Sequence, residues 1–184
     1  MPSMLFGLYG PSRAGKTTLI NALLHARNDI CLLKSCTTRQ ARVGSEDYYH
    51  YRYCREREFQ AMIKNKQMAT HMTYAGAMYG FLRSDIRLIT RPQGRSAKWI
   101  CAVTEDGIED LQKQGVQVVP IQIIPEDVPE NILAQIDADR RAADQHRLQN
   151  SRIRPAVVIN NSFRNESILD SIASLFGFLE TYSP

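Results

Sequence analysis

The sequence predicts an α/β fold in which helices flank a central parallel sheet. Three observations predict it: short apolar runs are typical of buried strands, helical stretches separate these runs, and a glycine-rich loop joins the first run to an amphipathic stretch. The 184 residues, 43% of them hydrophobic and 23% charged, suffice for one domain with a large core. This composition excludes a wholly disordered chain, a collagen, a coiled coil and a disulfide scaffold.

The first strand is expected at residues 4–9, an apolar run that stops at a Gly-Pro pair. A helix follows, because apolar residues recur there at helical spacing. Further strands are expected at residues 31–35, 97–103, 116–124 and 156–159, and a helix at 56–66. Residues 36–55 are polar and rich in arginine, and we expect them to form an inserted lobe. A last helix, at about 165–179, is expected to face the core with Ile168, Leu169, Ile172, Leu175 and Phe176.

Composition also limits the cellular setting and the partners. No apolar run approaches the ~18 residues needed to span a bilayer, and the start has no signal-peptide pattern, so we expect a cytoplasmic protein without a membrane partner. The four cysteines form no Cys-x-x-Cys pair and are expected to be reduced. The net charge of +4 is too small to indicate nucleic acid, but five arginines between positions 39 and 57 indicate a local anionic ligand.

Residues 10–17 fit the phosphate-loop pattern G-x-x-x-x-G-K-[ST]. Its glycines let backbone N–H groups converge on phosphate oxygens, and the following helix directs its positive end at the same anion. Lys16 would reach the β- and γ-phosphates, and the Thr17 hydroxyl would bind Mg²⁺. The motif predicts a P-loop NTPase fold that takes ATP and Mg²⁺. The expected nucleotide contacts are Gly10, Ser12, Arg13, Ala14, Gly15, Lys16, Thr17 and Thr18.

The run from Ser35 to Gly44 resembles the S-x-T-T-R-x-x-R-x-G pattern of the guanylate kinase family. Tyr51 falls at that family's phosphate-binding tyrosine, residues 58–63 match its E-F-x-x-M-I stretch, and residues 78–80 match its Y-Y-G turn. The resemblance covers residues 4–81 well and the remainder loosely.

The resemblance implies a single guanylate-kinase-like domain with a core at 1–34 and 82–184, an acceptor-binding lobe at 35–81 and a shortened lid at about 126–140. It implies an enzyme that transfers the γ-phosphoryl group of ATP to GMP, dGMP or a related nucleoside monophosphate. Two arginines three residues apart can hold one dianion with forked bonds. The implied acceptor site comprises Arg39, Arg42, Tyr51 and Tyr79 at the phosphate, with Ser35, Thr70, Gly80 and Phe81 beside them.

Departures from the family pattern concern the acceptor base and sugar. Thr70 stands where the family has the acid that binds guanine donors, and Phe81 replaces a small hydroxyl residue. Loss of that carboxylate would reduce guanine preference by about 10²-fold or more, so either the base is bound differently or there is no guanine. The family's D-x-D pattern is also absent; Glu105 and Asp106 could substitute for it, although capping of the next helix is favoured.

For catalysis we expect Lys16 with Arg140 and Arg141 in the lid region; Arg147, Arg152 and Arg154 are further candidates.

Three alternatives remain open at this point. Kinases of ribose 1,5-bisphosphate are relatives that also lack the guanine-binding acid, and they share a Gly-Ser-Glu turn like that at residues 44–46. Non-catalytic interaction modules of the same family typically lack a working phosphate loop, whereas Lys16 and Thr17 are present here. A kinase of nucleic-acid ends is disfavoured by the modest charge. The sequence does not determine the oligomeric state.

Overall fold

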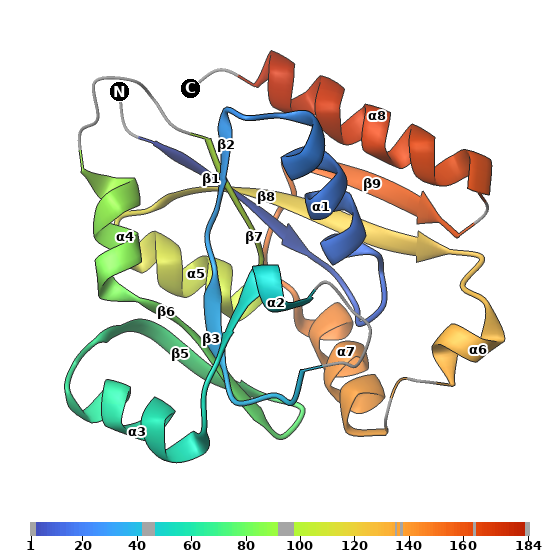
Figure 1. Cartoon of the computed structure of the whole chain (residues 1–184). Coiled ribbons are helices and arrows are strands. Elements are labelled where there is room, and N and C mark those ends of the chain that lie inside the picture. The colour runs from blue at the N-terminus through green and yellow to red at the C-terminus, as the bar shows by residue number, and fades with distance from the viewer. Residues whose placement is uncertain are drawn as a thin grey trace.

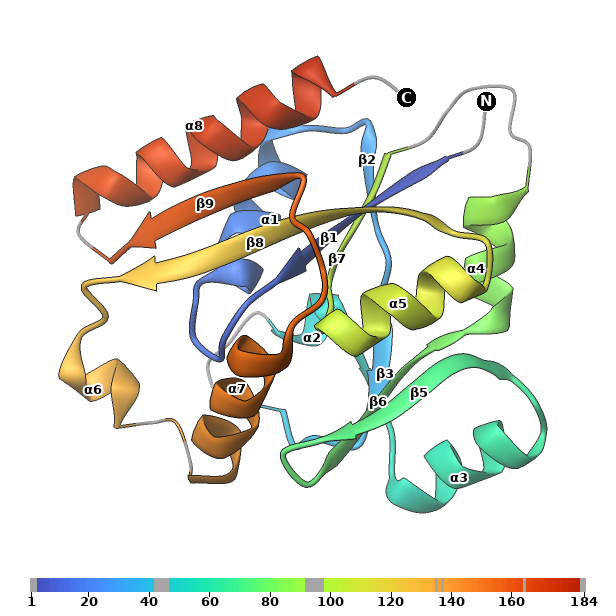
Figure 2. The same ribbon diagram turned by 180° about the vertical axis from the view of Figure 1, so that it is seen from behind.

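The computed structural model describes residues 3–41, 47–91, 98–134, 136, 138–163 and 165–182 (Figures 1 and 2). Within them, a parallel sheet of five strands has the order β2-β7-β1-β8-β9. This confirms the predicted α/β class. The strands are β1 (Met4–Tyr9), β2 (Ile30–Leu32), β7 (Lys98–Ala102), β8 (Gln117–Glu126) and β9 (Val157–Ser162).

A second, smaller sheet has the order β4-β3-β6-β5 and lies below the main sheet in Figure 1. Its strands are β3 (Ser35–Thr37), β4 (Tyr51–Tyr53), β5 (Met68–Tyr74) and β6 (Ala77–Leu82). Helix α3 (Glu56–Lys64) packs on this sheet through Phe59, which is buried beside Cys36 and Met68. The short helix α2 (Asp47–His50) precedes β4.

The single strand predicted at residues 31–35 is two strands. β2 ends at Leu32 in the main sheet, and β3 begins at Ser35 in the smaller one. Between them Leu33 is buried against Phe81 and Ile86, so an apolar side chain anchors the passage from one sheet to the other. The apolar residues thus continue past the point where the chain leaves one sheet for the other. For this reason the hydrophobic pattern alone does not reveal the end of β2.

Helices cover both faces of the main sheet, and the side chains of β1 alternate between the two resulting cores. Phe6 and Leu8 pack with α1 and α8, whereas Leu5 and Tyr9 pack with α4 and α5 (Figures 1 and 2). The remaining helices are α1 (Lys16–Ala26), α4 (Arg83–Thr90), α5 (Glu105–Lys113), α6 (Glu130–Leu133), α7 (Ala138–Asn150) and α8 (Asn165–Thr181). None of them, over the described residues, has the length and apolarity that crossing a bilayer requires.

The prediction for the core face of α8 is wrong at Leu169, which is 65% exposed. The buried stripe of this helix runs through Ser171, Leu175 and Leu179. Leu169 precedes Ser171 by two residues, so at about 100° per residue it points to the opposite side. Ile168 lies outside the side chains that the structure describes.

Candidate active site

The phosphate loop lies at the carboxyl end of β1 and leads directly into α1. Gly10 has a φ of +137°, and a Cβ there would come within 2.2 Å of the carbonyl oxygen of Ile123 on β8. The loop is therefore pressed against the neighbouring strand, which only glycine permits. This position, at the carboxyl edge of a parallel sheet, is where open α/β folds bind ligands.

Asn161 supports the loop from β9. It is 1% exposed, and its Nδ2 donates to the carbonyl oxygen of Ala14 over 2.9 Å. No motif of the sequence pointed to this residue. Its available signal was the pair of asparagines, at positions 160 and 161, that follows the apolar strand expected at residues 156–159.

Lys16 curls back over the loop, since its Nζ donates to the carbonyl oxygens of Gly10 and Pro11 at 2.7 Å each. Its ammonium group is thereby held at the loop. Lys16 and Thr17 line a cavity of about 560 Å³. All the predicted nucleotide contacts line it: Gly10, Ser12, Arg13, Ala14, Gly15, Lys16, Thr17 and Thr18.

The same cavity extends to a cluster of arginine and tyrosine on the smaller sheet. The guanidinium carbon of Arg39 lies 5.1 Å from the ring centroid of Tyr51, and its Nη2 donates to the Tyr53 hydroxyl over 3.3 Å. The rings of Tyr51 and Tyr79 are 6.4 Å apart. A guanidinium held among phenol hydroxyls is suited to an anion. The structure thus places Arg39, Tyr51 and Tyr79 together, whereas Arg42 lies outside the described residues.

The other predicted acceptor contacts form one buried part of the cavity wall. They are Ser35, Thr70, Gly80 and Phe81. A Cβ on Gly80 would come within 2.3 Å of the Thr70 carbonyl oxygen, so β5 and β6 approach closely here. Phe81 belongs to the apolar core with Leu33 and Ile86. This part of the wall therefore presents hydroxyl groups and apolar surface, with no carboxylate among these four residues.

Helix α7 contributes further charged groups to the cavity. Arg140 lines it, and its Nη2 donates to the Tyr79 hydroxyl over 3.2 Å. Arg141 is exposed and does not line it, because consecutive helical residues point about 100° apart. Arg147 lines it as well, whereas Arg152 and Arg154 are exposed.

The start of α5 differs in detail from the expectation that Glu105 or Asp106 caps this helix. Thr104 is the N-cap, and its hydroxyl accepts the N–H of Gly107 over 3.2 Å. Glu105 and Asp106 follow in the first turn, where the helix dipole favours negative charge. Both pair with Arg147, at 3.6 and 3.1 Å respectively. Capping thus falls to Thr104, and the two acids bind α7.

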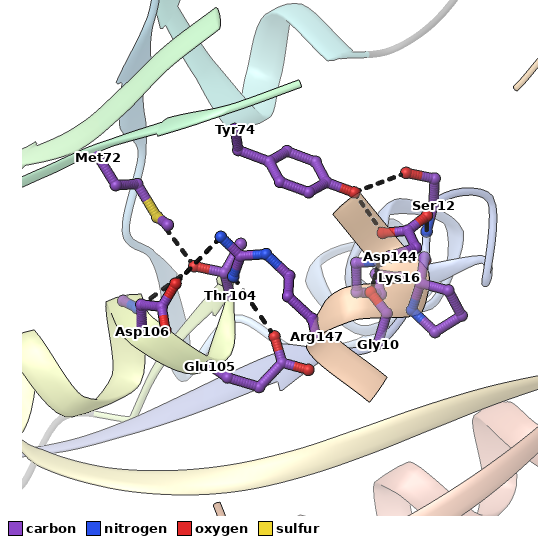
Figure 3. A network of polar contacts seen from close by, with 12 residues as sticks. Gly10, Ser12, Lys16, Met72, Tyr74, Thr104, Glu105, Asp106, Asp144 and Arg147 are labelled. Carbon is purple, nitrogen blue, oxygen red and sulfur yellow. Dashed lines mark hydrogen bonds and ion pairs between the residues drawn. The ribbon is translucent and has the colours of Figure 1, made fainter. Parts of the chain in front are cut away.

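A polar network that the sequence did not reveal connects the loop, the smaller sheet and α7 (Figure 3). The Ser12 N–H donates to Asp144 Oδ2 over 2.8 Å, and the Tyr74 hydroxyl donates to Asp144 Oδ1. The Ser12 and Tyr74 hydroxyl oxygens are 3.1 Å apart. Burial, and next the hydrogen bond to Asp144, raise the pKa of Tyr74. The Tyr74 ring also has Arg147 4.9 Å and Arg140 5.9 Å from its centroid.

The parallel sheet and its phosphate loop place the chain among the P-loop nucleotide-binding proteins. Within that class a sequence model described as guanylate kinase matches residues 4–176, and the chain therefore belongs to the guanylate kinase family. The resemblance stated from the motifs is confirmed.

Individual relatives agree with this assignment. A guanylate kinase of Jannaschia sp. (strain CCS1) is 31% identical over 129 residues, which are 69% of this chain and 58% of that protein. One of Trichodesmium erythraeum (strain IMS101) is 29% identical over 175 residues, or 93% and 92% of the two chains. The match thus spans under two thirds of the first relative's length but nearly all of the second's. The crystal structure of guanylate kinase from Anaplasma phagocytophilum shares the fold, with a TM-score of 0.72, 21% identity and coverage of 97% and 85%.

Proposed function

We propose that this chain is an ATP-dependent kinase that transfers the γ-phosphoryl group to the phosphate of a nucleoside monophosphate, with GMP and dGMP as the first candidates. One observation carries the proposal: the phosphate loop and the arginine–tyrosine cluster line the same cavity of about 560 Å³. A donor phosphate and an acceptor phosphate can therefore lie in one enclosure, and positioning of this kind supplies much of the catalysis of phosphoryl transfer.

The donor end fits a triphosphate with Mg²⁺. Gly10 allows the close loop, and the Ser12 N–H already donates to a carboxylate, which shows that this amide is directed at an oxyanion. The Thr17 hydroxyl would contact Mg²⁺, which usually takes few protein ligands and completes its shell with phosphates and water. Bound Mg²⁺·ATP would supply the phosphoryl group, and Lys16 would hold its phosphate oxygens.

At the acceptor end, Arg39, Tyr51 and Tyr79 would hold the acceptor phosphate, and Arg42 is assigned there through the family pattern. Arg140 extends from α7 to the Tyr79 hydroxyl, so of the two lid arginines it is the one we assign to charge stabilisation during transfer. The exposure of Arg141 favours a surface role. The sugar and base would contact Ser35, Thr70, Gly80 and Phe81.

The domain organisation is part of this proposal. The smaller sheet, which runs from Ser35 to Leu82, supports an acceptor-binding lobe at residues 35–81 inserted into a core of 1–34 and 82–184. The lid is assigned to about 126–140. A small-molecule acceptor and a cytoplasmic location, where ATP and nucleoside monophosphates occur together, complete the proposal.

The experiment is a phosphoryl-transfer screen with Mg²⁺·ATP over GMP, dGMP, AMP and ribose 1,5-bisphosphate, with ADP formation as the readout. We expect turnover with GMP or dGMP. The panel includes the sugar phosphate because Thr70 provides no carboxylate for guanine. ADP formation with none of the four acceptors, by protein that is folded according to circular dichroism, would refute the kinase assignment.

A further inference from the structure

The phosphate loop binds an oxyanion that its own chain supplies. Asp144 of α7 is half-buried in the cavity, and its Oδ2 accepts the Ser12 N–H over 2.8 Å. Backbone N–H groups of such loops are the donors that bind phosphate oxygens. One N–H cannot serve the carboxylate and a phosphate at full strength, and two anions at one point repel each other.

Tyr74 of β5 also binds this carboxylate. Its hydroxyl donates to Oδ1 of Asp144, so each carboxylate oxygen has a donor, one from the loop and one from β5 (Figure 3). The Ser12 hydroxyl, 3.1 Å away, then donates to the Tyr74 oxygen. A phenol keeps its proton at neutral pH and can therefore donate, and burial together with the Asp144 hydrogen bond raises the pKa of Tyr74 further.

Two arginines of α7, one before and one after Asp144 in the sequence, bind other parts of the fold. Arg140, Asp144 and Arg147 follow at i, i+4 and i+7 and therefore share one face, and all three line the cavity. Arg140 reaches the Tyr79 hydroxyl on the smaller sheet, and Arg147 pairs with the acidic first turn of α5. The helix thus presents a negative group to the loop between two cationic groups.

We propose that Asp144 is an internal ligand of the phosphate loop which the donor phosphates must displace, so that α7 blocks the donor site of the ligand-free chain. This inference rests on the proposed binding of a nucleoside triphosphate at the loop. Displacement of the carboxylate removes the repulsion at Ser12 and leaves Arg140 facing the incoming phosphates.

The test is the binding of Mg²⁺·ATP without acceptor, measured by isothermal titration calorimetry. Asp144→Ala is expected to bind ATP about tenfold more tightly than the unaltered chain, because the competing charged hydrogen bond is gone. Asp139→Ala is the matched control. It removes the same charge from an exposed position of the same helix, and its ATP affinity is expected to stay within about twofold.

Tyr74→Phe separates displacement from general repulsion, because it loosens Asp144 without changing the net charge. We expect it to bind ATP at least about threefold more tightly, and it tests the proposal even if Asp144→Ala does not fold. The proposal that Asp144 is displaced would be overturned if Tyr74→Phe bound ATP more weakly, or if the unaltered chain, Asp144→Ala and Tyr74→Phe bound it equally well. The proposed function would then still stand. Failure of all these folded proteins to bind ATP would overturn the proposed function together with this inference.

Discussion

Gly15 and Asn161 pack so closely that a Cβ on Gly15 would come within 2.2 Å of the Asn161 Nδ2. The contact joins the end of the phosphate loop to the edge strand β9, and the same Nδ2 donates to the carbonyl oxygen of Ala14. Gly15 is the second glycine of the motif. A residue far along the chain, Asn161, therefore leaves no space for a side chain at this position.

Gly15→Ala should destabilise the chain more than Gly115→Ala. Both glycines have positive φ, +85° and +80°, so both variants incur backbone strain of about 1 kcal/mol. A Cβ at Gly115 meets nothing within 4 Å, whereas at Gly15 it meets Asn161, which should add roughly 1–3 kcal/mol. Urea unfolding of the two variants measures the difference. Equal midpoints would show that Asn161 can move aside without lowering the free energy of unfolding.

Lys16→Ala should reduce kcat by roughly 10²–10³-fold, because a positioned charge that stabilises the transition state is lost. The control is Lys64→Ala on α3, an exposed lysine that does not line the cavity. Steady-state kinetics at saturating ATP and acceptor measure both. Unchanged turnover in a folded Lys16→Ala protein would contradict the donor-site assignment.

Arg39→Ala should raise the KM of the acceptor by roughly 10–100-fold and leave the KM of ATP nearly unchanged, since charged hydrogen bonds contribute about 1.5–3 kcal/mol. Arg87→Ala, which removes an exposed arginine of α4, should change neither constant. The assignment of the acceptor phosphate to Arg39 fails if the KM of ATP rises instead.

Thr70→Glu should raise the preference for GMP over AMP by roughly tenfold or more, because a carboxylate can accept two adjacent guanine donors. Thr73→Glu places the same charge on the same strand, but at an exposed position, and should leave the preference unchanged. The measurement is the ratio of kcat/KM values for the two acceptors, after melting curves confirm that both variants are folded. An unaltered ratio for Thr70→Glu would show that the base of the acceptor does not bind beside residue 70.

Tyr9 should make the stability depend on pH at alkaline values. Burial, and to a smaller extent the charge of Glu105, raise the pKa of Tyr9 from 10.0 to about 12. The folded state thus holds the proton more tightly, so this contribution is complete below pH 10 and disappears as the pH rises through about 12. Between pH 9 and 12, the free energy of unfolding of Tyr9→Phe, measured with urea, should fall by about 2 kcal/mol less than that of the unaltered chain. Identical losses would refute the shift.

The sequence predicted much of the fold because the buried strands are short apolar runs. The strands at residues 4–9 and 116–124 were expected within a few residues of where they lie, since β1 is buried along its whole length and β8 along much of it, which leaves mostly apolar residues in both. The passage from β2 to β3 was missed, because Leu33 continues that signal while the chain changes sheets. Leu169 was misplaced because an apolar residue within a helix was counted toward the apolar stripe, although it points to the opposite side of the helix.

By itself the sequence determined the phosphate loop and the local arginine and tyrosine pattern, because their chemistry depends on residue type at short spacing. Only the tertiary structure decided that Arg39 and Lys16 line one cavity, that Asn161 fixes the loop and that Asp144 occupies the Ser12 amide. The residues of these three pairs are 23, 147 and 132 positions apart in the sequence. Such pairs meet only through the order of strands and the packing of α7, which no local pattern encodes.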